Sequence, residues 1–155
     1  MSTSQSAEVS RTAWSPVGLG QAFAAGVLAV PAFHQILLWI LHAAGIVPIA
    51  PFKMAPTKPL GIPEIVSISF WGGVWGVVFA LTLPRWFRGT AYWISAPVAG
   101  GVALTFVFMF VVWPLKFGGF PPEAVGLFII GFLLNAAWCI GWALFLLWFE
   151  RMRGA

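Results

Sequence analysis

The residues of this chain that are best suited to chemistry lie in the apolar stretch AVPAFHQILLWILHAAG, residues 29–45. His34 and Gln35 are adjacent there, and His42 follows eight residues after His34. A neutral imidazole can ligate haem iron or transfer a proton near neutral pH. On a straight helix the two histidines are about 12 Å apart along the axis, whereas one shared metal ion would need i, i+4 spacing. We therefore predict no metal site and no resident cofactor, and we keep haem ligation by His34 and His42 as an alternative.

Two more polar side chains, Gln21 and Asn135, also lie inside apolar stretches. Polar groups in such surroundings either hydrogen-bond to neighbouring helices or line a path for a solute or a proton. The first hypothesis has His34 and Gln35 bonding between helices. The second is a polar path lined by Gln21, His34, Gln35 and Asn135. His34 would relay protons along it, although no acidic residue accompanies that histidine inside the apolar stretch.

The acidic residues Glu64 and Glu123 each follow a proline and begin an apolar stretch. A carboxylate in the first turn of a helix interacts favourably with the positive end of the helix dipole, so we expect helix capping. Acid and base catalysis would require the two carboxylates to converge beside a water-activating group. The lone Cys139 supports neither a disulfide nor a multi-cysteine metal site. We predict no catalytic residues and no enzymatic activity.

The composition places these residues in a membrane protein. Of the 155 residues, 61% are hydrophobic and 8% are charged, whereas soluble domains are roughly half apolar and a quarter charged. The net charge of +4 comes from basic residues placed singly or in pairs between apolar stretches, which argues against nucleic-acid binding. Backbone groups in hydrocarbon must be paired within the segment, so each long apolar stretch is expected to be a helix.

The predicted fold is therefore an all-α bundle of four transmembrane helices. The spans are expected at about residues 18–45, 65–83, 91–113 and 124–149. They form one transmembrane domain, residues 17–150, between a polar N-terminal tail, residues 1–16, and a short basic C-terminal tail, residues 151–155. The first span is too long for a hydrocarbon core of about 30 Å, so Pro31 is expected to interrupt it.

Small residues one helical turn apart recur in three of the four spans. They let neighbouring backbones approach closely, which is how helices associate in lipid. The expected packing positions are Ala22, Gly26, Gly72, Gly76, Ala96 and Gly100. Two pairs of segments are also alike: AAGVLAVPAFHQILLW resembles AGGVALTFVFMFVVW, and GIPEIV resembles GFPPEAV. These matches raise, as a hypothesis, a 2+2 tandem repeat of helical hairpins.

The distribution of lysine and arginine predicts the orientation, because cytoplasmic loops carry an excess of both. Five basic residues lie on the side of the two termini: Arg11, Arg85, Arg88, Arg151 and Arg153. Three lie on the opposite side: Lys53, Lys58 and Lys116. We therefore predict that both termini are cytoplasmic. The first outer loop, IVPIAPFKMAPTKPLGIPE, holds five prolines and is expected to form a polyproline-like strap over the mouth of the bundle.

The segments FHQILLWILHAAG, PFKMAPTKPLGIPE and SFWGGVWG resemble a group of small four-span inner-membrane proteins of bacteria, over residues 18–149. The resemblance implies a bacterial inner-membrane location, and it carries no activity or site residues. We expect a non-enzymatic accessory, assembly or scaffold subunit that packs against lipid and other membrane helices, as a homo-oligomer or hetero-oligomer. The alternatives are a small transporter or channel and a haem-bearing redox subunit.

Overall fold

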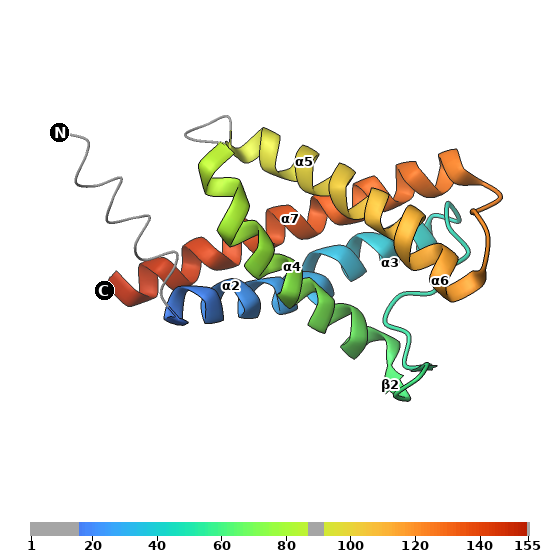
Figure 1. Ribbon diagram of the computed structural model, residues 1–155, viewed down its shortest axis with the longest axis horizontal. Helices are drawn as coiled ribbons and strands as arrows, with labels where there is room; N and C mark the ends of the chain where they lie inside the picture. The colour runs from blue at the N-terminus through green and yellow to red at the C-terminus, as the bar shows by residue number, and fades with distance from the viewer. Residues whose placement is uncertain (1–15, 87–91, 155) are drawn as a thin grey trace.

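The computed structural model describes residues 16–86 and 92–154 as four long helical rods (Figure 1). The first rod consists of α2 (Pro16–Ala29), the π-helical turn η1 (Val30–His34) and α3 (Gln35–Ala43). The second rod is α4 (Glu64–Trp86). The third consists of α5 (Tyr92–Val107), the π-helical turn η3 (Phe108–Val112) and α6 (Trp113–Phe117). The fourth is α7 (Ala124–Gly154).

Each rod is long and apolar enough to cross a membrane, and the chain is a multi-pass membrane protein. The four candidate spans are Val17–Ala43, Glu64–Leu83, Tyr92–Phe117 and Ala124–Arg153. The prediction of an all-α bundle of four transmembrane helices is thereby confirmed. The third span continues past its expected end to Phe117, and Pro114 lies in this extension, directly after the π turn η3. The predicted N-terminal tail apart from Pro16, together with Arg11 and Arg88, lies outside the described residues.

Two of the rods are interrupted by a π-helical turn, in which each N–H donates to the carbonyl five residues earlier. Gln35 N–H donates to the Val30 carbonyl, and Trp113 N–H donates to the Phe108 carbonyl. Pro31 lies inside the first of these turns, at the position where the sequence predicts an interruption. A proline has no N–H for the preceding turn, and the wider π turn lets the helix continue past it.

The strap between the first two spans contains a short hairpin rather than the extended polyproline segment that the sequence predicts. Strands β1 (Pro56–Thr57) and β2 (Ile62–Pro63) pair antiparallel. Gly61 closes the turn with a φ of +68°, a conformation that glycine adopts without steric cost. The Thr57 hydroxyl donates a 2.8 Å hydrogen bond to the Ile62 carbonyl across the turn. These local bonds explain why the chain folds back on itself here.

Helix α7 is the centre of the bundle and runs through its whole length (Figure 1). Helix α2 packs against both α4 and α7, and α5 packs against α7. Helix α4 crosses the other rods steeply (Figure 1). The core is formed by small residues of α2, such as Ala22, and by large aromatic residues, of which Trp142 is fully buried. Phe79 contacts Trp138 and Trp142 edge-to-face, with ring centroids 5.6 and 6.1 Å away.

The similar segments share part of their packing in the two hairpins. When Gly26 is aligned with Gly101, four buried positions coincide: Ala25, Gly26, Ala29 and Val30 correspond to Gly100, Gly101, Leu104 and Thr105, whereas the buried Ala22 and Gln35 correspond to residues that are not buried. When Glu64 is aligned with Glu123, three coincide: Phe79, Ala80 and Leu83 correspond to Trp138, Cys139 and Trp142, whereas the buried Gly72, Gly73 and Gly76 correspond to half-buried residues. A contact is also shared, because Gly72 packs against Val30 and Gly131 packs against Thr105. The two hairpins therefore share part of their buried faces.

Candidate functional site

Gln35 anchors the outer strap to the first rod. This side chain begins α3 and is only 4% exposed. Its Oε1 accepts a 2.7 Å hydrogen bond from the backbone N–H of Phe52 in the strap. Phe52 has a φ of +51°, which is uncommon for a residue with a side chain. A buried glutamine without partners would be costly, so this bond satisfies the amide and fixes the strap at the same time.

The same glutamine determines the protonation of His34. The Phe52 N–H can only donate, so its partner must be the Gln35 oxygen, and the amide nitrogen Nε2 then faces Nδ1 of His34 at 3.3 Å. An amide nitrogen also only donates, so Nδ1 accepts and the ring proton lies on Nε2. His34 is therefore held as a neutral imidazole. Haem ligation through Nε2 would require the ring proton to move from Nε2 to Nδ1. A protonated Nδ1 could no longer accept the hydrogen bond from Gln35, so that bond would break.

His42 makes a different contact, farther along the same rod. Its Nδ1 lies 3.0 Å from the Val47 carbonyl, which can only accept, so Nδ1 carries a proton and donates it. The two histidines make separate contacts, one with Gln35 and one with Val47. In residues 16–86 and 92–154 no group of three or more His, Cys, Asp or Glu side chains is placed to hold a metal ion.

Asn135 joins the fourth span to the third. Its Nδ2 donates a 3.1 Å hydrogen bond to Oγ1 of Thr105, a side chain with no exposed surface. Gly131, one turn away on α7, leaves the space that the Thr105 side chain fills. Cys139 extends the same seam, because its Sγ donates to the Ala96 carbonyl at 3.4 Å. These contacts use the polar groups of α5 and α7 to hold the two helices together.

Gln21 lies near the opposite end of the first rod from Gln35. Its Nε2 is 3.5 Å from the Phe149 carbonyl on α7, and its Oε1 is buried without a partner in the described part of the chain. The four predicted polar residues thus bond to different segments. His34 and Gln35 bond to one another, Asn135 bonds to α5, and Gln21 contacts the end of α7. Among the described residues, no hydrogen bond links these three groups.

Two buried tryptophans carry contacts that the sequence analysis missed. Trp138 Nε1 donates a 3.0 Å hydrogen bond to the Gly26 carbonyl, and Trp142 Nε1 donates a 3.2 Å bond to the Ala22 carbonyl. Their rings stack with centroids 6.5 Å apart. The indicator in the sequence was their i, i+4 spacing at mid-span among small residues, in AAWCIGWA. Tryptophans at membrane interfaces, by contrast, lie near the span ends.

The small residues expected at packing positions lie inside the molecule. Gly26 faces the backbone of Gly72, and Gly76 faces the Ala22 carbonyl. A Cβ atom on Gly100 would lie 2.9 Å from the Phe79 ring and 3.0 Å from the sulfur of Cys139. Ala96, which is 2% exposed, belongs to the same core. The small-residue seams therefore join the helices of one chain.

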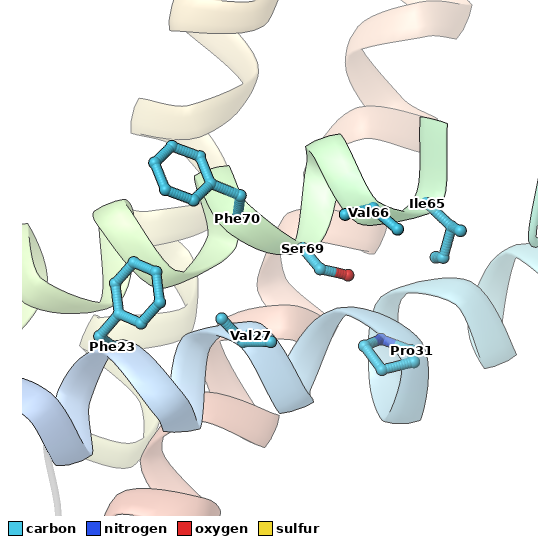
Figure 2. Close-up of a pocket in the computed structure, with 7 residues that line it drawn as sticks. All are labelled: Phe23, Val27, Pro31, Ile65, Val66, Ser69 and Phe70. Carbon is cyan, nitrogen blue, oxygen red and sulfur yellow. The ribbon is translucent and has the colours of Figure 1, made fainter. Parts of the chain in front are cut away.

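A groove of about 370 Å³ opens on the surface between the first rod and α4 (Figure 2). Six of its seven lining residues are apolar, and the seventh is Ser69. Pro31 borders the groove from η1, where the π turn lies. This groove was not predicted, because its lining residues come from two spans and are ordinary membrane residues one by one.

Comparisons with protein-family models, curated proteins and solved structures found no match for this chain. The fold and the contacts themselves define the class: a multi-pass α-helical membrane protein whose polar side chains join its own segments.

Proposed function

We propose that this chain is a non-enzymatic accessory, assembly or scaffold subunit of a bacterial inner membrane, with both termini in the cytoplasm. One observation supports the proposal: the buried polar side chains form hydrogen bonds between segments of the same chain. Gln35 holds the strap, Asn135 holds α5, and the indole groups of Trp138 and Trp142 hold α2. An enzyme or a transporter usually keeps such costly groups for a substrate, since polar side chains in a membrane are expensive.

A partner helix would contact the outward faces of the bundle, because the small-residue seams are already occupied. Helix α7 presents a stripe of large apolar side chains at helical spacing. Its exposed members include Val125, Ile129, Leu133, Ile140 and Leu144. A continuous stripe of this kind fits either lipid or a neighbouring apolar helix.

The test is affinity purification of the tagged full chain from native membranes in mild detergent. We expect a membrane partner or a second copy to co-purify with the wild type. Ile129→Trp and Leu133→Trp change the outward stripe of α7, and Val98→Trp makes the same change at an exposed position of α5. If α7 is the docking face, the first two variants lose the partner and the third retains it. A monomer without any partner contradicts the proposal.

A small transporter or channel is the second candidate, and the partly shared packing of the two hairpins favours it. Internal repeats are common in transporter folds. The Oε1 of Gln21, which is buried without a partner in the described part of the chain, is a polar atom that a path could use. A flux assay in proteoliposomes, with wild type and His34→Ala, distinguishes the two candidates. A solute or ion flux that the variant abolishes supports the transporter, and no flux in either protein supports the scaffold.

A further inference from the structure

The groove between the first rod and α4 is open to the surface and has a volume of about 370 Å³. Its walls are apolar, with Phe23 and Phe70 meeting edge-to-face at 5.9 Å. An unbranched hydrocarbon chain is thin enough to lie along such a surface. The apolar walls of the groove therefore suit an acyl chain.

Ser69 gives this apolar groove one polar point. Its hydroxyl extends into the space between α4 and the first rod (Figure 2). In the described part of the chain this hydroxyl makes no side-chain hydrogen bond, unlike those of Thr57, Thr82 and Thr105. A hydroxyl in an apolar site gains stability from a partner, and the ester oxygens of a lipid are acceptors of the right kind.

One end of the groove lies beside a basic part of the strap. Ile65, which lines the groove, donates its backbone N–H to the Lys53 carbonyl at 3.0 Å. Lys53 and Lys58 are both exposed on this strap, and Glu64 is the one carboxylate in this segment. Two ammonium groups against one carboxylate give this strap a net positive charge. Lysines at a membrane interface extend their charged ends toward the headgroups.

We propose that this groove binds an anionic phospholipid. The phosphate lies near Lys53 and Lys58, an ester oxygen accepts the Ser69 hydroxyl, and one acyl chain extends along the groove toward Phe23 and Phe70. The order of these groups along the groove matches the order of polarity along a lipid. This inference is independent of whether the chain is a scaffold or a transporter, because it concerns the lipid-facing surface alone.

The test uses the purified full chain in mild detergent, with phosphatidylglycerol and phosphatidylcholine of identical acyl chains as probes. Native mass spectrometry measures the lipid that each protein retains, and thermal unfolding confirms that each variant folds. Ser69→Phe and Val66→Trp fill the groove from its wall and its rim. Val78→Phe is the matched control, because Val78 is exposed on the same helix outside the groove. The double variant Lys53→Gln, Lys58→Gln removes the charge.

We expect the wild type and the Val78 variant to bind phosphatidylglycerol at least tenfold more tightly than phosphatidylcholine. Both groove-filling variants should lose at least tenfold in affinity for phosphatidylglycerol, and the lysine variant should bind the two lipids equally. Equal binding of both lipids by the wild type would overturn the proposal. So would unchanged binding by a folded Val66→Trp protein, even if Ser69→Phe failed to fold. A protein partner crosslinked at Val66 in place of lipid would assign the groove to that partner and refute the lipid site.

Discussion

Replacing Gly26 by alanine tests whether close backbone contact between α2 and α4 holds the bundle together. A Cβ atom at this position would overlap the Gly72 carbonyl oxygen, and it would lie 2.8 Å from the Gly72 carbonyl carbon and 3.0 Å from the Gly73 Cα. All of these atoms belong to the backbone, which cannot rotate out of the way as a side chain could. The two helices must therefore move apart.

The expected size of the effect follows from three terms. Overpacking of a close contact costs about 1–3 kcal/mol, and a clash with backbone belongs at the upper end of that range. The hydrogen bond from Trp138 to the Gly26 carbonyl, which contributes about 1 kcal/mol, is weakened as well. Alanine regains about 1 kcal/mol through its higher helix propensity. We expect a net loss of about 2–3 kcal/mol, or roughly 30- to 150-fold in the unfolding equilibrium.

The assay is reversible unfolding in detergent micelles, followed by the fluorescence of the ten tryptophans. Gly20→Ala is the matched control, because Gly20 lies in the same helix and a Cβ atom added there would have no neighbouring atom within 4 Å. This control should be unchanged or more stable by up to about 1 kcal/mol. If Gly26→Ala were as stable as Gly20→Ala, the seam would not be tight, and the account of the α2–α4 contact would be wrong.

Four further substitutions test the polar contacts. Gln35→Leu should free the strap, which is measured as faster amide hydrogen exchange at Phe52 and a loss of about 1–2 kcal/mol; unchanged exchange at Phe52 would contradict the anchoring role. Asn135→Val and Thr105→Val should each destabilise the protein by about 0.6 kcal/mol, with the double variant no worse than either single one; additive losses would show that the two residues are not coupled. Trp142→Phe keeps an aromatic ring but removes the hydrogen bond and part of a fully buried side chain, so we expect a loss of more than about 1 kcal/mol and an intact fold; an equal stability would contradict this account of the contact.

The number and nature of the spans could be predicted because hydropathy is a local property. Each span is an apolar stretch whose backbone N–H and C=O groups must form hydrogen bonds with one another. This requirement does not depend on neighbouring segments. The interruption at Pro31 could be anticipated for the same reason, since a proline removes its N–H wherever it stands. The second π turn, Phe108–Val112, contains no proline and was not predicted.

The partners of the polar side chains could not be predicted from the sequence. Gln35 was expected to bond between helices, whereas its oxygen holds Phe52 of the strap, 17 residues away along the chain. The indole of Trp142 bonds to a carbonyl 120 residues away. Such pairs depend on the rotation of each helix about its axis and on where the helices cross, which are decided by packing.

The sequence by itself determined that this chain resides in a membrane as four helices, because backbone groups in hydrocarbon must be paired within each apolar segment, whatever lies beside it. Only the tertiary structure decided that the glycine seams lie inside one chain, that two tryptophans bond to the backbone of α2, and that an apolar groove remains open beside α4. In lipid, helices gain little from hiding apolar surface, so shape and a few hydrogen bonds select their arrangement. The fit between two helices depends on the surfaces of both, so it cannot be predicted from either segment alone.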